Sequence, residues 1–483
     1  MPEAIPRSSQ TSYWLGEALA TDPVEARPRL SGDLSADVVI VGGGYTGMWT
    51  AWFLTERFPG IDVVLVEADR CGFGPSGRNG GFVTGWWDEA DDLVERYGRG
   101  GALRACRALS ESIEAIGEWC RTQDVDAWYL RAGWIGVAST QAQEGAWAGA
   151  VEACKDLDVA DELRALSPRK VREACRSPVF GAGVIMRDGA TVQPARLALG
   201  LRRTLLDRGV QIFERSRVMR AATERTRPGS SVLAETAQGR VRAGRAVLSM
   251  GPWAAAWPGL QRSVVVRGSY ILMTSPAPGL LEDIGWTTGE CISDYRTALH
   301  YFRTTPDGRV AFGGAGRSEW STRVSPMHDF DEASVRALRR DFLRFFPAFR
   351  EVRIEEAWGG PVDVSPLHHP VFGTLDSGTI HYALGYTGNG VGPSHLAGRV
   401  LSALATGTED PVTDLPMVNR RPVRLPPAAL TSVGAFVVQS AIARKERAED
   451  DGTGAGPLTR FVASLPRRLG YALGPKPRGP RQK

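Results

Sequence analysis

The sequence predicts an α/β fold in which nucleotide-binding units alternate with a sheet-rich second domain. Three observations predict it: a glycine-rich turn between an apolar strand and a helix near residue 42, a second strand–helix–strand crossover roughly 150 residues later, and a strand–glycine turn–helix unit near residue 390. Segments rich in β-forming residues separate these units. One discontinuous domain interleaved with another explains this order better than a row of separate domains.

The first unit is the stretch DVVIVGGGYTGMWTAWFL, which begins at Asp37. Residues 38–41 are an apolar β-branched run, typical of a strand that is buried on both faces. Gly42, Gly44 and Gly47 then follow at the spacing G-x-G-x-x-G and open a predicted helix. In this arrangement the glycines allow a tight turn, a close approach by a pyrophosphate and close helix–strand packing, while helix N–H groups face the phosphates.

An acidic residue follows at the distance that a ribose requires. The stretch IDVVLVEADR predicts a second strand over residues 61–66 that ends at Glu67. A carboxylate about 20 residues after the glycines can accept hydrogen bonds from both ribose hydroxyls. An acid at this point, rather than an arginine, argues against a 2′-phosphate. The residues alone therefore predict an adenine dinucleotide, either NAD or FAD.

The middle of the chain is predicted to contain the crossover. A second glycine-rich stretch, CGFGPSGRNGGFVTGWW, is followed by a helix over about 89–120 and by strands near residues 128–139 and 181–194. A helix then runs from Pro194 to a stop at Gly209, and VQIFERSRV returns as a strand.

The later part of the chain is predicted to form an antiparallel sheet and then a third glycine turn. VVVRGSYILMTS and ALHYFRTTPDGRVAFGGAG have the pattern of antiparallel strands, with a Pro-Asp-Gly turn at 306–308. A helix follows over 332–346. The stretch HYALGYTGNGVGPSHLAGRVLSALATG then predicts a strand, a glycine turn at 387–392 and a helix for which Ser394 is the expected N-cap.

Composition limits the class of protein. The chain is 43% hydrophobic and 23% charged, which is ordinary for a globular protein with a large core. It has no apolar run of the ~18 residues that span a bilayer and no secretory leader pattern, so we expect a cytoplasmic protein. The six cysteines lack zinc-binding spacing, so we expect free thiols and no metal.

The positive charge is concentrated at the C-terminus. Seven basic residues follow Asp451, the last acidic one, so the rest of the chain has a net charge of −3 against +4 for the whole. The Pro/Gly-rich end GPKPRGPRQK predicts a solvated, disordered tail. Aromatic residues do not alternate with these charges, so we expect no nucleic acid partner, and we do not expect the tail to contact a membrane. Residues 426–446 are predicted to form an amphipathic helix.

Several stretches together resemble the D-amino-acid oxidase/glycine oxidase/sarcosine oxidase family of FAD-dependent amine oxidoreductases, and most of all its gamma-glutamylputrescine oxidase-like members. In chain order they are VIVGGGYTGMWTAWFL…VVLVEA, PSGRNGG, ATVQPARLALGLRRTLLDRGVQIFE, YFRTTPDGRVAFGG, EAWGGPVDVSP and GYTGNGVGPSHLAGRVL. The resemblance covers roughly residues 12–407 and is far more specific than the glycine spacing alone.

The resemblance implies a glutathione-reductase-type, Rossmann-like FAD-binding domain interleaved with an antiparallel-sheet substrate domain, that is, an α/β fold with an α+β second domain. The implied ranges are 36–100, 181–260 and 355–410 for the FAD-binding domain, 101–180 and 261–354 for the substrate or cap domain, and 411–483 for a C-terminal extension.

The resemblance also implies that the nucleotide is FAD. Its binding residues would be Gly42, Gly44, Tyr45, Thr46, Gly47, Glu67, Ala68, Arg78, Asn79, Gly80, Val218, Gly251, Trp253, Gly388, Asn389, Gly390 and Val391. Family members often have histidine where this chain has Asn389, so any role that needs an imidazolium is in doubt. The cysteine or histidine that tethers flavin in some relatives is missing at the corresponding places, which implies non-covalent FAD.

The implied reaction is the oxidation of an amine or amino acid. Hydride passes from the carbon that bears nitrogen to flavin N5, the resulting imine is hydrolysed, and O2 or another acceptor reoxidises the flavin. A gamma-glutamylputrescine-like substrate is one candidate. We expect aromatic side chains and one arginine to line the substrate pocket, the arginine as a clamp for a carboxylate. The candidates are Tyr270, Tyr301, Arg303, Trp358 and Tyr386.

Two other functions are consistent with parts of the sequence. An NAD-dependent dehydrogenase would use the first glycine turn but leave the turn at 388–392 without a ligand. A flavin-free binding protein would dock through its basic tail. The sequence decides neither the specific amine, nor oxidase against dehydrogenase, nor the oligomeric state.

Overall fold

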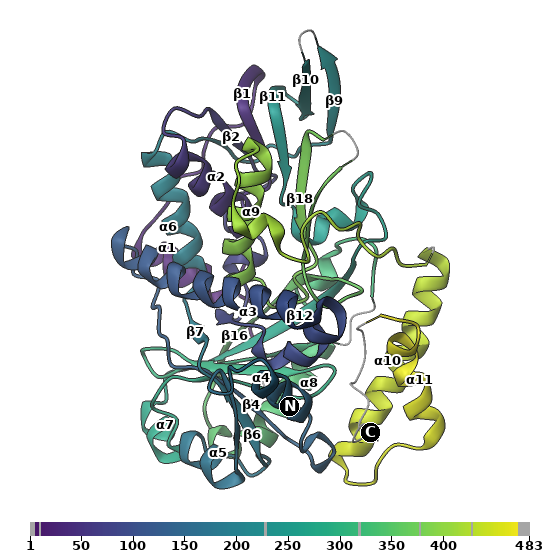
Figure 1. The fold of residues 1–483 in the computed structure, drawn as a ribbon. Helices are drawn as coiled ribbons and strands as arrows, with labels where there is room; N and C mark the ends of the chain where they lie inside the picture. The colour runs from purple at the N-terminus through teal and green to yellow at the C-terminus, as the bar shows by residue number, and fades with distance from the viewer. Residues whose placement is uncertain are drawn as a thin grey trace.

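The computed structural model describes residues 5–8, 11–226, 229–316, 320–375, 378–426 and 428–471. The predicted α/β fold class is confirmed: helices pack around two large mixed sheets (Figure 1). The basic end of the chain, for which we predicted disorder, lies outside the described residues. Within the described residues, no helix is both long and apolar enough to cross a membrane.

The first sheet contains the nucleotide-type units. Its strand order is β17-β18-β11-β1-β2-β8, and the hairpin β9–β10 extends it from β11. The strands from β18 to β8 are mutually parallel. Bounds are β1 Gly32–Val41, β2 Val63–Val66, β8 Gln211–Phe213, β9 Arg220–Thr226, β10 Gly229–Glu235, β11 Gly239–Leu248, β17 Val371–Thr374 and β18 Ile380–Leu384.

The end of β1 is buried on both faces, as its β-branched run predicts. Val38 and Ile40 belong to the core on one side of the sheet, and Val39 and Val41 to the core on the other. The helices α2 (Tyr45–Arg57), α6 (Pro194–Asp207) and α9 (Val391–Thr406) lie on the first of these sides. Parallel strands need such crossover helices, which confirms the predicted strand–helix–strand units.

The second sheet is mostly antiparallel. Its order is β16-β12-β15-β14-β13-β4-β6-β5, and only the pair β13–β4 is parallel. Helix α8 (Glu332–Phe345) packs an aromatic-rich core against it. Bounds are β4 Trp134–Val137, β5 Leu163–Leu166, β6 Gly183–Met186, β12 Val265–Thr274, β13 Cys291–Asp294, β14 His300–Thr304, β15 Val310–Ala315 and β16 Ile354–Val364.

Two strands lie in a different sheet from the one that the predicted domain ranges suggest. β6 falls within 181–260 and β16 within 355–410, yet both pair in the second sheet. The long helix α3 (Ala90–Thr122) begins in one predicted domain and continues into the other, where Leu109 and Ile113 pack against the start of α9. The division into domains stays a prediction. The remaining elements are β3 Phe82–Thr84 with β7 Gly189–Thr191, α4 Ala148–Asp156, α5 Pro168–Ala174 and α7 Pro278–Ile284.

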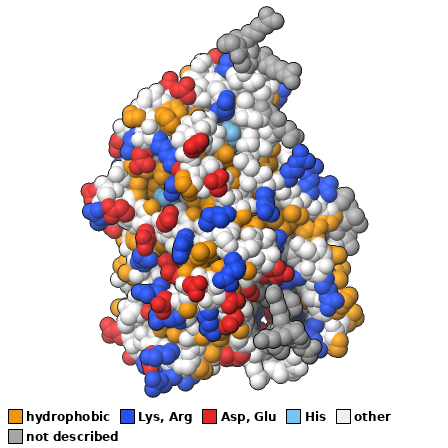
Figure 2. Space-filling model, viewed as in Figure 1, with side chains coloured by type: hydrophobic (Ala, Val, Ile, Leu, Met, Phe, Trp, Pro, Cys, Tyr) orange, Lys and Arg blue, Asp and Glu red, His pale blue; other side chains and the backbone are white. Residues whose placement is uncertain are grey.

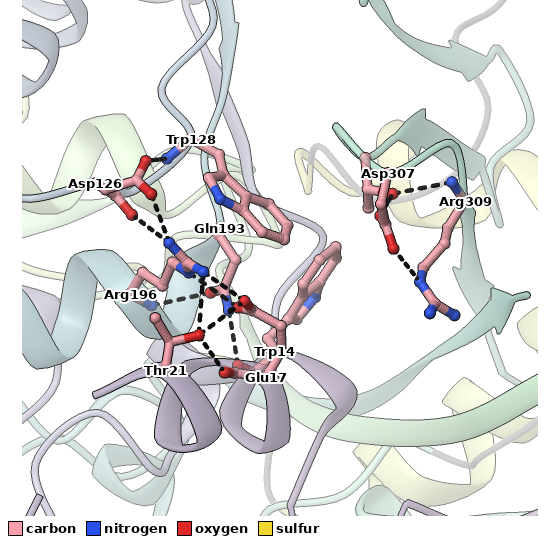
Figure 3. A network of polar contacts seen from close by, with 10 residues as sticks. Trp14, Glu17, Thr21, Asp126, Trp128, Gln193, Arg196, Asp307 and Arg309 are labelled. Atoms are coloured by element: carbon pink, nitrogen blue, oxygen red, sulfur yellow. Dashed lines mark hydrogen bonds and ion pairs between the residues drawn. The ribbon is translucent and has the colours of Figure 1, made fainter. Parts of the chain in front are cut away.

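An N-terminal helix that the sequence analysis did not predict, α1 (Tyr13–Thr21), is fixed to α6 by charge (Figure 3). Glu17 accepts a hydrogen bond from Gln193 Nε2 at 2.7 Å and from Arg196 Nε at 3.0 Å. The Arg196 guanidinium also pairs with Asp126 at 2.7 Å. These partners lie more than a hundred residues from the helix, which is why local pattern did not indicate it.

The C-terminal extension forms a pair of helices against the body of the protein (Figure 1). A helix was predicted over 426–446, and α10 (Ala428–Asp450) covers this range from residue 428 onward. Ala463 of α11 (Pro457–Arg468) packs on Ala441 and Ile442 of α10. On the face seen in Figure 2, basic and acidic side chains of the described residues are interspersed rather than gathered into a basic stripe.

A buried ion pair joins α6 to the first sheet. Glu214, fully buried just after β8, pairs with Arg202 at 2.8 Å and accepts from the backbone N–H groups of Arg27 and Cys71. Burial raises the pKa of the Glu214 carboxyl, but these hydrogen bonds outweigh it, so the net pKa is lowered. The carboxylate is therefore charged and fully satisfied in the folded protein.

We predict that Glu214→Gln lowers the free energy of unfolding by about 3 kcal/mol, because it leaves the Arg202 guanidinium buried without a charged partner. Urea unfolding of both proteins measures the change. Glu235→Gln, which removes the largely exposed pair with Arg220, is the control and should change stability by less than about 1 kcal/mol. Equal effects of the two substitutions would contradict the assignment.

Candidate functional site

A cavity of about 2490 Å³ is lined by elements of both sheets. The glycine turn at 42–46 and the turn at 388–391 both line it, together with Ser269 and Ile271 of β12 and Tyr301 of β14. Segments that are hundreds of residues apart in the chain thus face one space. This is the arrangement that the sequence analysis requires for a single bound dinucleotide.

The parallel strands explain why the turns converge. β1 and β18 point the same way in the sheet, so the helices that follow them, α2 and α9, begin at the same edge. Their N-caps are Gly44 and Gly390, which have no side chain to cap the helix, although Tyr45 N at the start of α2 donates to Ser76 Oγ at 2.9 Å. Ser394, the predicted N-cap, instead lies in the first turn and donates to Val391 O at 2.7 Å. Both starts therefore offer backbone N–H groups and a positive dipole end to the cavity.

The three glycines of the first turn have different roles. A Cβ on Gly47 would lie 2.0 Å from Gly42 O, so this position must be glycine for the helix to pack on the strand. Gly42 has φ +111, which only glycine adopts readily. Gly44 has ordinary backbone angles and faces the cavity, and a Cβ there would lie 3.1 Å from Ser76 Oγ. The backbone and packing thus require glycine at 42 and 47 more strictly than at 44, where a role for a ligand stays a prediction.

Glu67 is held in place beside the same turn. Its carboxylate accepts from Gly43 N at 2.7 Å and from Asp69 N at 2.8 Å, and it lines the cavity. Burial raises the pKa of this carboxyl, and the two backbone hydrogen bonds oppose the rise. The carboxylate is therefore preoriented at the end of β2, where a ribose acceptor is needed.

The segment 75–81 forms another wall. Arg78 pairs with Asp329, and its carbonyl accepts from Trp358 Nε1 at 2.8 Å. Asn79 Oδ1 accepts from Gly81 N at 2.7 Å, which fixes the short turn. The turn is thus held by Trp358 of β16, by Asp329 and by its own hydrogen bond.

The structure brings the predicted cofactor residues together. All of them except Gly47 line the cavity: Gly42, Gly44, Tyr45, Thr46, Glu67, Ala68, Arg78, Asn79, Gly80, Val218, Gly251, Trp253, Gly388, Asn389, Gly390 and Val391. Gly47 lies behind the turn and serves packing. The contact of each lining residue with a cofactor stays a prediction.

The predicted substrate residues divide into two groups. Tyr301 and Tyr386 line the cavity, where their hydroxyls lie 2.8 Å from Ser269 Oγ and 2.7 Å from Thr46 Oγ1, respectively. Burial raises the pKa of Tyr301 to about 12, so its phenol stays protonated at neutral pH. Both rings thus present neutral aromatic surface to the cavity.

Tyr270, Trp358 and Arg303 are not among the lining residues of the cavity, and a substrate-pocket role for them stays a prediction. Tyr270 and Trp358 are core side chains with exposed fractions of 0% and 1%. Arg303 is buried, and its guanidinium donates to the carbonyls of Val192 and Thr304. Burial lowers its pKa to about 10. Its Nε and Nη1 are thus engaged by backbone carbonyls.

Sequence reasoning missed Arg267, which lines the cavity from the same strand as Tyr270. Strand alternation places Arg267, Ser269 and Ile271 on one face and Tyr270 on the other. The period-two pattern was visible in the sequence, but which face points at the cavity depends on the neighbouring strands. Glu446 of α10, also in the lining, had no local signal.

One side of the cavity is rich in carboxylates. They come from the segment before α3, from its first turns and from α4: Asp88, Glu89, Asp91, Asp92, Glu95, Glu152 and Asp156. Lys445 and Arg467 of the C-terminal helices also line the cavity, and Arg467 Nη2 lies 3.5 Å from Asp92 Oδ2. Acidic walls of this kind concentrate cationic solutes at a site.

The lining fits an adenine dinucleotide with a flavin ring. It has two helix N-termini for phosphate or ring oxygens and an acidic acceptor at the end of β2. In addition, Asn389 Oδ1 is buried without a hydrogen-bond partner among the described residues, so a ligand N–H or O–H could satisfy it. Among the described residues, no group of three His, Cys, Asp or Glu side chains is arranged for a metal ion.

Comparisons with known proteins agree with this geometry. The model of the DAO family, described as FAD dependent oxidoreductase, matches residues 37–404. Gamma-glutamylputrescine oxidoreductase of Escherichia coli K12 is 29% identical over 403 residues, which cover 82% of this chain and 89% of that protein. Probable oxidoreductase OrdL of Haemophilus influenzae is 26% identical over 385 residues, 78% of this chain and 84% of that protein.

Solved structures share the fold. Glycine oxidase from Geobacillus kaustophilus superposes with a TM-score of 0.63 at 19% identity, covering 81% of this chain and 100% of that one. L-proline dehydrogenase from P. horikoshii gives a TM-score of 0.63 at 17% identity, covering 80% and 97%. At these identities the likeness concerns the fold alone.

We predict that Gly44→Ala lowers the affinity for FAD about tenfold or more, because the added methyl group enters the space that the dinucleotide backbone approaches. Titration of the flavin-free protein with FAD measures it. Gly60→Ala, where a Cβ meets nothing within 4 Å, is the control and should bind FAD as the unchanged protein does. Unchanged FAD affinity in Gly44→Ala would contradict this role.

A second prediction concerns Asp363 of β16, a buried carboxyl in the lining that accepts from Gly385 N at 2.5 Å. Burial raises its pKa to about 6, against the opposing backbone hydrogen bonds. Its folded pKa therefore exceeds its unfolded value, so ionisation weakens folding as pH rises from about 4 to 6.

Asp363→Asn keeps the acceptor oxygen but removes this ionisation. The difference in unfolding free energy between variant and unchanged protein should therefore move by about 3 kcal/mol in favour of the variant between pH 4 and pH 7. Denaturant unfolding of both proteins at the two pH values measures the shift. A difference that does not vary with pH would show that Asp363 is not a buried acid of raised pKa.

Proposed function

The chain belongs to the DAO family of FAD dependent oxidoreductases, and we propose that within it this protein oxidises the C–N bond of an amine or amino acid. The carbon that bears nitrogen loses a hydride and the nitrogen a proton, which gives an imine. Water then converts the imine to a carbonyl compound and ammonia or an amine. O2 or another electron acceptor takes up the electrons at the end of the cycle.

The observation that carries this proposal is the single cavity that contains both the cofactor-type residues and Tyr301 and Tyr386. FAD bound there would supply the electron acceptor for the oxidation. Glu67 would hold its ribose, and the starts of α2 and α9 would hold its phosphates and flavin ring. N–H groups at 388–391 are suited to stabilise negative charge that develops on the ring. We propose that the flavin is non-covalent, since no cysteine is among the lining residues.

The chain's own residues would position the amine and exclude water. Tyr301 and Tyr386 offer aromatic faces to an arriving ammonium and are themselves fixed by hydrogen bonds to Ser269 and Thr46. The carboxylates before and within α3 would draw the cation to the cavity. An amine must lose its proton before oxidation, and desolvation beside the rings of Tyr301 and Tyr386 would favour the neutral form.

For the substrate, we propose an extended, polar amine of the gamma-glutamylputrescine type. A relative of that name covers 82% of this chain, and the acid-rich lining is suited to a molecule with more than one nitrogen. The volume of the cavity also exceeds what a small amino acid would fill beside a dinucleotide.

We predict that the flavin-loaded protein bleaches near 450 nm when γ-glutamylputrescine is added under anaerobic conditions. Stopped-flow absorbance against a panel of γ-glutamyl amines, free diamines and amino acids gives the preference. N-acetylated γ-glutamylputrescine, whose terminal nitrogen is an amide, is the control and should not bleach the flavin. If no amine or amino acid in the panel bleaches it, the proposed reaction is wrong.

A further inference from the structure

Arg267 is an arginine in the cavity whose side chain has no hydrogen-bond or ion-pair partner among the described residues. It lies on β12 two residues before Ser269 and faces the cavity. Its side chain makes no hydrogen bond or ion pair with any described residue, and its Nε is buried without a partner. Burial lowers the pKa of this guanidinium. A partly buried guanidinium without a carboxylate partner costs stability, so its retention points to a ligand that completes it.

Glu446 lies within electrostatic reach of Arg267 but is not paired with it. The Glu446 side chain is buried at 7% exposure and lines the same cavity from α10. One of its oxygens accepts from Ala298 N at 3.0 Å, which orients the carboxylate. Arg267 lowers the pKa of Glu446, and Glu446 raises the pKa of Arg267. The two side chains nevertheless do not form an ion pair, for which a nitrogen and an oxygen must lie within 4.0 Å. A positive and a negative group therefore face one space side by side.

The wall that carries Glu446 comes from the C-terminal extension. α10 begins at Ala428, after residue 404, where the match to the family model ends. Its C-terminal end is fixed to the body by ion pairs of Asp450 with Arg296 and, at 3.1 Å, with Arg344. The loop 295–299 is thereby held between α10 and the cavity. The extension thus contributes a charged side chain that the family-matched part of the chain does not contain.

We propose that Arg267 and Glu446 form a subsite for a zwitterionic α-amino-acid head group, with Arg267 binding the carboxylate and Glu446 the ammonium. The proposal rests on the proposed function and names its substrate class: amines whose far end carries a free α-amino acid, as γ-glutamyl amines do. Such a head group satisfies both side chains at once. A free diamine has no carboxylate, so it would leave Arg267 unpaired, and an anion without a nitrogen would leave Glu446 unpaired.

The test uses the flavin-loaded protein and N-γ-glutamylpropylamine, a probe that has the head group but no terminal amine to oxidise. Isothermal titration calorimetry measures its dissociation constant. Arg267→Gln and Glu446→Gln should each weaken binding about 10- to 100-fold, because each removes a charged hydrogen bond. Arg447→Gln, at an exposed neighbouring position of α10 outside the lining, is the control and should bind the probe unchanged.

A second readout separates the subsite from general damage. The rate of anaerobic flavin reduction by 1,4-diaminobutane should change less in Arg267→Gln than the affinity for the probe does, since this diamine has no head group. Arg267→Lys, which keeps the charge but not the bidentate geometry, should lie between the two in probe affinity. It also tests the proposal if the glutamine variant does not fold.

The outcomes are distinct. The subsite would be overturned if both glutamine variants bound the probe with unchanged affinity. It would also be overturned if Arg267→Gln lost as large a factor in the rate of flavin reduction by the diamine as in affinity for the probe. If the unchanged protein binds the probe in the predicted way but no amine reduces its flavin, the subsite stands and the proposed function fails. If amines reduce the flavin but the probe does not bind, the function stands and the subsite fails.

Discussion

The structure depends on the close approach of helices α2 and α9 at the edge of the first sheet. A Cβ on Gly398 of α9 would lie 2.5 Å from Trp49 Cβ of α2, so this contact exists only because position 398 is glycine. Gly47 plays the same part between α2 and the end of β1, where its missing Cβ leaves room for Gly42 O and Ser249 Oγ. With these contacts the two helix starts reach one cavity. Larger residues at positions 47 and 398 would push the two helices apart, and the N–H groups near 44 and 390 could then no longer bind one ligand.

The sequence predicted the parts of the fold whose causes are local. The spacing G-x-G-x-x-G identifies Gly42, Gly44 and Gly47 as the turn, and the apolar run of 38–41 indicates a buried parallel strand. The hairpin turn at 306–308 connects β14 and β15 as predicted. Most of the FAD-type residues were named through the family resemblance, and sixteen of the seventeen line the cavity, Gly47 alone lying behind it.

The substrate side could not be predicted in this way, because strand residues choose a face only through their neighbours. Arg303 was the expected clamp, but β14 turns it toward the carbonyls of Val192 and Thr304. Arg267 lines the cavity instead. It lies on β12, which is separated from β14 by β15 in the sheet. Glu446 reaches the cavity only because α10 docks on the loop near Ala298, about 150 residues earlier in the chain. Periodicity within either segment gives no sign of that contact.

The central claim is that one cavity, formed by segments far apart in the chain, holds FAD and the substrate together. A crystal structure of the flavin-loaded protein tests it most directly. The account predicts continuous density for a single FAD from Glu67, past Gly44, to the turn at 388–391, with the ring open toward Tyr301 and Tyr386. Density for the dinucleotide in another part of the molecule, or a ring that faces away from these tyrosines, would contradict it.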